Sequence, residues 1–214
     1  MRRFASVLIC IVVAAGFAGA LGGCSSPSGG GGAASGGLPD TMDLGNPQAK
    51  VTVNEFASLG CPICAKWNNE VFPAFKAKYV DTGKVHYVLH EFLTGDQPVA
   101  AAGFLLARCA GKDKYFQVVD AVFHQEAPLL ESDQNAAKKD ALVKIAESLG
   151  MTDAQFEACV SNDDALKALN DRSEAAAKKY GVTGTPTFII GNQTLVDFQD
   201  LAAIDKAIAQ AGGS

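Results

Sequence analysis

The sequence predicts an α/β fold in which a run of helices interrupts a sheet. Two segments rich in apolar residues, Lys50–Ala57 and Lys84–Leu93, flank a stretch with helical spacing. Ala-rich amphipathic stretches then follow one another over residues 98–180, and two short apolar strands come after them in Gly184–Phe198. Strand, helix and strand open a parallel sheet that the late strands complete, so the helices between them form an insertion.

The first strand leads into a helix that begins at a cysteine. Lys50–Ala57 follows a turn at Gly45–Pro47 and alternates apolar with polar side chains, as a strand does. The helix is expected to start at Cys61, because Pro62 suits a first helical turn, and Pro73 is expected to kink it. Its apolar positions at helical spacing are Trp67, Val71, Phe75 and Tyr79.

The second strand, Lys84–Leu93, follows a turn at Asp81–Gly83, and after it the pattern becomes helical. Helices are expected over residues 98–110, 113–125, 135–149, 152–160 and 162–180. The expected helix caps are Ser132, Asp133, Thr152 and Asp163. Gly191 and Asn192 predict a hairpin turn between the strands of Gly184–Phe198, and a last helix is expected over residues 199–210.

The N-terminal segment is expected to lie outside this fold. Arg2 and Arg3 precede an apolar run, and the small residues of Leu21–Cys24 follow it, which is typical of a secretion signal over residues 1–23. A transmembrane anchor is the alternative. Residues 24–40 are mostly Gly, Ser and Ala and predict a flexible tether. The folded domain is expected over residues 41–214; with 48% of the chain hydrophobic, it can fill one main core.

The letters LGGC at Leu21–Cys24 resemble the lipobox of bacterial lipoproteins, in which the peptide is cut before the cysteine and that cysteine carries lipid. The resemblance implies a lipid on Cys24 that holds the protein at a bacterial membrane, on its extracytoplasmic side. The alternative is an ordinary secretory cleavage nearby that leaves Cys24 free.

The charge of the chain argues against nucleic acid as a partner. Without the signal, 16 basic and 23 acidic residues give a net charge of −7. The basic residues form short pairs beside helical alanines, which is typical of solvated helix faces.

The six cysteines are expected to have four different fates, because export allows disulfides to form. Cys10 leaves with the signal, and Cys24 is the candidate lipid site. Cys109 and Cys159, fifty residues apart, are expected to form a structural disulfide. The alternative is that both are buried free thiols that pack as small apolar side chains. The remaining two, Cys61 and Cys64, form a Cys-x-x-Cys pair.

This pair fits redox chemistry better than a metal site. Structural zinc normally takes four Cys or His ligands, and His86, His90 and His124 have no ligand spacing relative to a second cysteine pair. A redox pair needs one sulfur held as thiolate and a second within reach. Cys61, at the expected helix N-terminus, meets the first need because the helix dipole lowers its pKa, and Cys64 meets the second.

A C-P-x-C at a helix start, between two strands, followed by a helical insertion and by Thr185-Pro186 before a hairpin, is similar to the DsbA-type thiol–disulfide oxidoreductases of the thioredoxin-like superfamily. The similarity covers about Gly45–Ala211. It implies a thioredoxin-like fold with an inserted helical bundle, and disulfide exchange with client proteins through a mixed disulfide. It also implies a membrane redox partner and no bound cofactor.

The resemblance implies roles for individual residues. Cys61 corresponds to the nucleophile and Cys64 to the resolving thiol. Pro186 corresponds to a cis-proline, next to which the backbone of Thr185 pairs with an extended substrate. Glu55 corresponds to a buried acid that exchanges a proton with Cys64, its pKa raised by burial. The alternatives are a trans Pro186 at a strand start and an exposed Glu55.

One departure from the family pattern leaves the direction of exchange open. Oxidising members commonly have C-P-H-C, and here Ile63 replaces the histidine, whose cation would stabilise the Cys61 thiolate. A weaker oxidant is therefore expected, and an isomerase or reductase is the first alternative. A Cu(I)-binding protein, since thiolates suit Cu(I), and a redox-inactive scaffold are the others.

Two further groups of residues receive no functional role from the sequence. Trp67 and Phe72 could line a substrate surface, but core packing is the preferred interpretation. His90 and Glu91, at the end of a predicted strand, are expected to be solvated.

Overall fold

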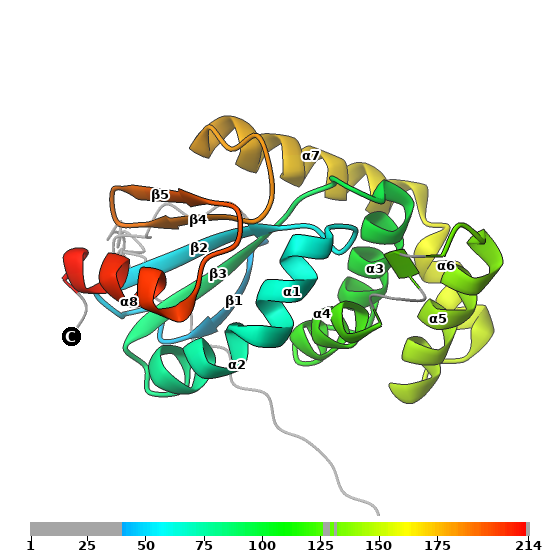
Figure 1. Cartoon of the computed structure of the whole chain (residues 1–214). Coiled ribbons are helices and arrows are strands. Elements are labelled where there is room, and N and C mark those ends of the chain that lie inside the picture. The colour runs from blue at the N-terminus through cyan, green and yellow to red at the C-terminus, as the bar shows by residue number, and fades with distance from the viewer. Residues whose placement is uncertain (1–39, 126–128, 131, 213–214) are drawn as a thin grey trace, which may run out of the picture. The chain divides into compact units, whose positions relative to one another are not determined.

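The computed structural model describes residues 40–125, 129–130 and 132–212, and these form an α/β domain around one sheet (Figure 1). The sheet has five strands in the order β1-β3-β2-β4-β5. The strands are β1 (Met42–Gly45), β2 (Val51–Ala57), β3 (Val85–Glu91), β4 (Thr187–Ile190) and β5 (Gln193–Val196). Only β2 and β3 are parallel, and the other three pairs are antiparallel. The predicted α/β fold class is confirmed.

The parallel pair is joined by the predicted helix, which is interrupted near its middle. Helix α1 (Pro62–Glu70) ends at Glu70, with Val71 as its C-cap, and the chain continues as α2 (Phe72–Phe75) and a π-helical turn, η1 (Lys76–Val80). Pro73 explains the break, since it has no N–H to continue the α-helical hydrogen bonds. The predicted kink is therefore confirmed.

Strand β1 was not expected from the sequence. It pairs antiparallel with β3 at the edge of the sheet, with Met42 opposite Leu89. It ends at Gly45, whose φ of 84° is in the left-handed region. A Cβ at this position would lie 2.4 Å from the carbonyl oxygen of Val85. Glycine therefore allows the chain to turn tightly against β3 before β2 begins.

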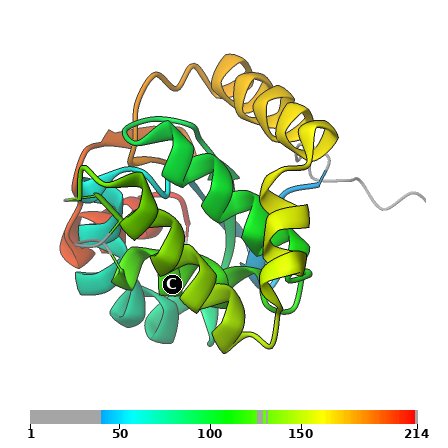
Figure 2. The same ribbon diagram turned by 90° about the vertical axis from the view of Figure 1, so that its right-hand side faces the viewer.

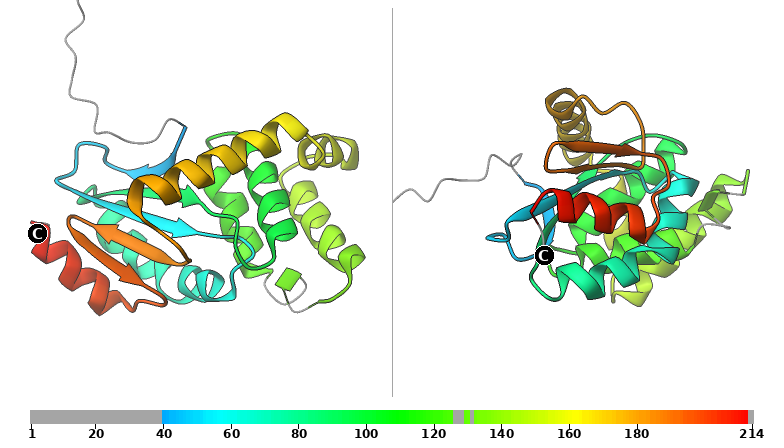
Figure 3. Two further views of the ribbon diagram at one scale, coloured as in Figure 1. Left: turned by 90° about the horizontal axis from the view of Figure 1, so that it is seen from above. Right: turned by 60° about the vertical axis from the view of Figure 1, so that its left-hand side comes forward.

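The insertion contains the five predicted helices. They are α3 (Gln97–Cys109), α4 (Tyr115–His124), α5 (Asn135–Ser148), α6 (Asp153–Val160) and α7 (Asp163–Tyr180). The first four gather beyond one end of the sheet, as Figure 2 shows end-on. The long α7 returns along the sheet on the side away from α1, and α8 (Leu201–Gln210) packs beside the β4–β5 hairpin (Figures 1 and 3).

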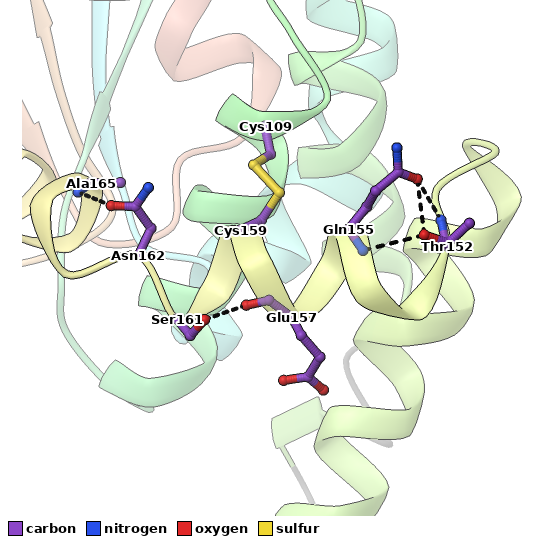
Figure 4. The surroundings of a disulfide bond; sticks show 8 residues. All are labelled: Cys109, Thr152, Gln155, Glu157, Cys159, Ser161, Asn162 and Ala165. Atoms are coloured by element: carbon purple, nitrogen blue, oxygen red, sulfur yellow. Dashed lines mark hydrogen bonds between the residues drawn. A yellow bond between two sulfur atoms is a disulfide. The ribbon is translucent and has the colours of Figure 1, made fainter.

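The caps of the inserted helices agree with the sequence only in part. Thr152 and Gln155 form the two reciprocal bonds of a capping box at α6 (Figure 4). Asn162, not Asp163, caps α7, because its side chain accepts the N–H of Ala165. Gln134, rather than the expected Ser132 or Asp133, is the N-cap of α5, and its side chain makes no capping bond.

A disulfide joins Cys109, at the end of α3, to Cys159 in α6, with the Cα atoms 6.0 Å apart (Figure 4). The expected pairing is therefore present. The alternative of two buried free thiols is wrong, because the two sulfurs are bonded and only Cys159 is buried, whereas Cys109 is exposed. The bridge holds α6 against α3 from the surface of the insertion.

Removing this bridge with Cys109→Ala and Cys159→Ala together is expected to lower the free energy of unfolding by about 4 kcal/mol, because the oxidised unfolded chain is restricted by a loop of fifty residues. Denaturant unfolding of both proteins measures the difference. An unchanged stability would show that the bridge does not restrain the unfolded chain.

His90 and Glu91 are buried, contrary to the expectation of a solvated pair. Their exposed fractions are 3% and 4%. The Glu91 carboxylate accepts hydrogen bonds from Arg108 Nε at 2.7 Å, from the Tyr115 hydroxyl at 2.9 Å and from Arg172 Nε at 3.1 Å. Two arginines, one from α3 and one from α7, thus compensate the negative charge of this buried carboxylate at the end of β3. Their hydrogen bonds connect the insertion to the sheet.

His90 lies on the opposite face of the sheet, under α7. Its ring stacks on Phe56 with 4.4 Å between centroids, and its Nε2 lies 2.9 Å from Asn54 Oδ1. Burial lowers the pKa of His90 to about 4, and the positive charge of Lys179 acts in the same direction. The imidazole is therefore neutral in the folded protein at neutral pH.

This histidine predicts a loss of stability in acid. The unfolded chain binds a proton below a pKa of about 6.5 and the folded protein only below about 4, so stability falls as the pH falls through this window. We expect a loss of about 3 kcal/mol from this group. His90→Gln should remove most of this dependence, whereas His124→Gln, exposed on α4, should retain it. Urea unfolding at a series of pH values measures both, and parallel pH profiles for the His90 variant and the wild type would contradict the assignment.

Candidate active site

The two cysteines of the C-P-x-C motif lie at the start of α1. Cys61 is the N-cap residue, with an extended backbone, and its Sγ accepts the N–H of Cys64 at 3.2 Å. The Cys64 thiol points back at it, with 2.6 Å between the two sulfur atoms. Cys61 is 7% exposed and Cys64 is fully buried. The helix start thus brings both sulfurs together and leaves only the first near solvent.

Close backbone contact holds this helix start in place. Asp96 N donates to the carbonyl oxygen of Gly60 at 2.9 Å. A Cβ on Gly60 would lie 2.1 Å from the Asp96 carbonyl oxygen, and a Cβ on Gly95 would lie 2.0 Å from that of Gly60. Glycine at both positions therefore lets the loop before α3 lie directly against the residue preceding Cys61.

The surroundings shift the pKa values of the two thiols in opposite directions. The hydrogen bond from Cys64 is the main cause that lowers the pKa of Cys61 to about 6, against the effect of burial. Thr185 and the backbone N–H groups of Ile63 and Cys64 act in the same direction as that bond. Burial raises the pKa of Cys64 well above its usual value, and the neighbouring Cys61 raises it further. Near neutral pH, Cys61 is the thiolate and Cys64 keeps its proton.

The loop before β4 faces Cys61. The Thr185–Pro186 peptide bond is cis, as predicted, and the Thr185 carbonyl oxygen lies 3.5 Å from Cys61 Sγ. The hydroxyl groups of Thr185 and Thr94 lie 2.8 Å apart. The fold thus places the cis-proline loop beside Cys61, although the two are 124 residues apart in the sequence.

An open hollow of about 330 Å³ lies beside the cis-proline loop. Thr183, Thr185 and Pro186 form part of its lining, together with Val196 from β5. Val196 is 59% exposed and Ile63, in the cysteine motif, is 44% exposed. Among the described residues, these are the two large apolar side chains that are exposed. Ile63 lies between the two cysteines, and Val196 lies opposite Thr187, the residue that follows the cis-proline.

Glu55 is buried on the face of the sheet that α1 covers, as expected from the resemblance. It is 2% exposed, and in the sheet it lies between Leu89 of β3 and Phe188 of β4. The Tyr87 hydroxyl donates to its Oε2 at 2.6 Å. Burial raises the pKa of Glu55 to about 8, and the charge on Cys61 adds to this, whereas the Tyr87 hydrogen bond lowers it.

Two residues of this site were missed at the level of sequence, Tyr87 and Thr94. Tyr87 lies within an apolar strand, where it resembles any core aromatic. Only the register of β2 against β3, which places Val53 opposite Tyr87, shows that its side chain lies on the same face as Glu55. Thr94 follows β3 in an irregular loop and has no motif of its own.

Trp67 belongs to the core, as expected from the sequence. It is 1% exposed and packs on Phe188 with 4.7 Å between ring centroids. Phe72, partly buried, packs against Trp67 at 5.6 Å. The predicted signal, the lipid site Cys24, Cys10 and the predicted tether as far as residue 39 lie outside the described residues. Asp40, the last residue of the predicted tether, is described, and its carboxylate accepts a hydrogen bond from Arg108 Nη1 at 2.6 Å. None of the helices within the described ranges is long and apolar enough to cross a membrane.

Proteins of known name and solved structures resemble this chain, among them the following three. A Rickettsia bellii protein named as a protein-disulfide oxidoreductase is 32% identical over 174 residues, which are 79% of this chain and 65% of that protein. Disulfide bond formation protein D of Bacillus cereus is 29% identical over 173 residues, or 78% of each chain. The crystal structure of Wolbachia pipientis alpha-DsbA1 matches with a TM-score of 0.72 and 27% identity, covering 82% of this chain and 94% of that one.

The rickettsial relatives are longer proteins, and the chain spans between 60% and 65% of their length. The family model for thioredoxin matches residues 38–210, which include every strand and helix described here. The helical insertion between β3 and β4 is shared with the DsbA structures, since the match to Wolbachia alpha-DsbA1 extends over most of both chains. The chain therefore belongs to the thioredoxin family and has the DsbA-like form of its fold.

Proposed function

We propose that the protein is a thiol–disulfide oxidoreductase that exchanges disulfides with client proteins through Cys61 and Cys64. The observation that carries this function is the contrast between the two thiols. Cys61, near solvent, has a pKa lowered to about 6, and the buried Cys64 beside it has a raised pKa. One thiol is poised to attack or to leave, and the other is protected until a mixed disulfide has formed.

The steps of oxidation follow from this contrast. A client thiolate attacks Cys61 Sγ of the Cys61–Cys64 disulfide, a client–Cys61 bond forms, and Cys64 leaves as a thiolate that takes a proton from Glu55. A second client thiolate then attacks the client sulfur, and Cys61 leaves as a thiolate. The client loses two electrons, which the enzyme keeps as the Cys61 thiolate and the Cys64 thiol. The stable Cys61 thiolate is a good leaving group, which favours this direction.

The surface beside Cys61 suits an extended segment of a client. The backbone of Thr185 is within 3.5 Å of Cys61 Sγ, so a strand paired with this loop would bring its own cysteine to the reacting sulfur. The adjoining hollow and the exposed Ile63 and Val196 offer apolar contact to neighbouring client side chains. Shape and backbone pairing, rather than charge, would select such clients.

Ile63 sets how oxidising the couple is. Ile63→His is expected to make the reduction potential of the pair less negative, because an imidazolium beside Cys61 stabilises the thiolate of the reduced form. Each ~30 mV of this change corresponds to about 1.4 kcal/mol. Equilibration with glutathione measures it, with Ile63→Asn as a polar control that carries no charge. Equal potentials for the two variants would show that charge at this position has no effect.

We also propose that the domain acts outside the cytoplasm and is held at a bacterial membrane by lipid on Cys24, where a membrane redox partner reoxidises it. The apolar segment before Leu21–Cys24 and the Gly- and Ser-rich stretch after it support this location. Mass analysis of the protein from membrane fractions tests the anchor. A lipid-modified N-terminal Cys24 supports it, and an unmodified Cys24 or a soluble product that begins elsewhere contradicts it.

Trapping of mixed disulfides tests the proposed activity. Cys64→Ser should accumulate client proteins bound covalently to Cys61, because the thiol that resolves the mixed disulfide is missing. Cys61→Ser is the matched control and should trap nothing, since Cys64 is fully buried. Non-reducing gels of cells that express each variant show the adducts. Trapping through Cys64 in the absence of Cys61 would reverse the roles of the two cysteines, and no trapping in either variant would contradict the function.

A further inference from the structure

Glu55 is held by one neighbour, the Tyr87 hydroxyl. The bond to Oε2 is 2.6 Å long, and the two side chains are 2% and 3% exposed. Across the described part of the chain, Glu55 has no other hydrogen-bond partner and no ion pair. Neutral phenol, rather than a cation, therefore accompanies this buried acid.

The Tyr87 ring is fixed from several sides. Phe72 of α2, Phe75 of α2 and Phe116 of α4 surround it, with ring centroids 5.3, 5.9 and 6.1 Å away. A ring packed in this way cannot turn its hydroxyl elsewhere without disturbing the core. The direction of the hydrogen bond to Glu55 is thus set by the packing of three phenylalanines.

The titratable groups around this pair are thiols and phenols. Cys61 at the start of α1 acts on Glu55, and Cys64 of α1 and Tyr115 of α4 act on Tyr87 through their charges. From β4, the residue opposite Glu55 is Phe188, which does not titrate. Apart from Glu55 itself, the groups given as acting on Tyr87 are thus a phenol and a thiol.

We infer that Tyr87 is a positioning residue for proton exchange between Glu55 and Cys64, because its hydroxyl occupies Oε2 and leaves Oε1 to carry the exchanging proton. This inference rests on the proposed function. When Cys64 must attack, its thiol proton passes to the Glu55 carboxylate, which becomes a carboxylic acid. The Cys64 thiolate then attacks Cys61 Sγ of the mixed disulfide, so that the Cys61–Cys64 bond forms, the Cys61–client bond breaks and the client sulfur leaves as a thiolate. In the opposite direction the acid returns the proton to Cys64. Tyr87 keeps its own proton in both directions.

The hydrogen bond also sets the pH at which this exchange occurs. It stabilises the carboxylate and so lowers the pKa of Glu55, which burial alone would raise further than about 8. Loss of the hydroxyl would leave less carboxylate at neutral pH to accept the Cys64 proton. The attack by Cys64 should then need a higher pH.

Reaction of the reduced protein with dithiobis(nitrobenzoate) separates the two attacks. The first thionitrobenzoate released reports attack by Cys61, and the second reports attack by Cys64 on the mixed disulfide. In Tyr87→Phe, the second release is expected to be about tenfold slower at neutral pH, and its pH midpoint to rise by about one pH unit. The first release should keep its rate and its pH profile.

Two controls distinguish positioning from a loss of structure. Tyr115→Phe removes another buried hydroxyl, which donates to Glu91 at 2.9 Å, and should leave the midpoint of the second release unchanged. In a Glu55→Gln background, Tyr87→Phe should have no further effect on the second release, because its action passes through Glu55. Circular dichroism verifies that each variant is folded.

Replacing tyrosine with fluorotyrosine tests the hydrogen bond from Tyr87 to Glu55 without removing the hydroxyl group. A more acidic phenol is a stronger donor to the Glu55 carboxylate, so the midpoint of the second release should move to lower pH. An unchanged midpoint in both Tyr87→Phe and the fluorotyrosine protein, or additive effects of Tyr87→Phe and Glu55→Gln, would overturn the role of Tyr87 while leaving the proposed function intact. A wild-type protein that shows no second release would overturn both.

Discussion

Cys61→Ala is expected to abolish disulfide exchange, lowering its rate by about a thousandfold or more. Cys61 lies at the start of α1 and is the less buried of the two sulfurs, and its thiolate is stabilised by Cys64 and by backbone N–H groups. Cys64 cannot take its place, because it is fully buried and its pKa is raised. Oxidation of a reduced, unfolded client protein, followed by the recovery of its native disulfides, measures the loss.

The matched control removes the other pair of cysteines. Cys109→Ala with Cys159→Ala should lose stability but keep exchange, since the bridge joins α3 to α6 within the insertion. Cys61→Ala should do the reverse and keep its stability. Substantial exchange in the Cys61 variant would mean that another cysteine carries the reaction.

Glu55→Gln is expected to stabilise the protein at pH 8 by about 4 kcal/mol. The pKa of Glu55 is about 8 in the folded protein against a usual value of 4.5, so the folded state holds a proton that the unfolded state has released. Stability therefore falls as the pH rises from about 4.5 to about 8, and this cost disappears when a neutral amide replaces the acid. Exchange through Cys64 should become slower at the same time.

Denaturant unfolding between pH 5 and pH 8 tests this expectation. Wild-type stability should fall over this interval relative to Glu55→Gln, and profiles that run parallel would contradict the raised pKa. Glu91→Gln is a control of opposite sign. Glu91 is paired with two partly buried arginines, so removal of its charge should destabilise the protein, by about 3 kcal/mol or more.

The regular elements could be predicted because each repeats a simple pattern. The segment from Cys61 to Tyr79 repeats apolar residues at helical spacing, and the helices of the insertion do the same over longer stretches. Strand β1 has four residues, two of them polar or glycine, and pairs only at the sheet edge, so it offers no periodicity to detect. The parts that sequence reasoning missed are those that depend on distant partners.

The residues of the candidate site also divide into those that a local motif reveals and those that depend on distant partners. The cysteines and Thr185-Pro186 are recognisable from local motifs, and the burial of Glu55 followed from the resemblance. Tyr87 became part of the site only through the register of two strands. Glu91 is buried because arginines from α3 and α7 reach it, and no local pattern around residue 91 contains that information.

The most direct test is an equilibrium titration of the protein with mixtures of reduced and oxidised glutathione, followed by thiol trapping and mass analysis. We expect Cys61 and Cys64 to convert together in one two-electron transition, with a reduction potential between about −270 and −120 mV, the values of thioredoxin and of the strong oxidant DsbA. Cys109–Cys159 should be oxidised throughout this transition. A Cys61 that only carries glutathione, with Cys64 still a free thiol at every ratio, would show that the two sulfurs do not form a redox couple.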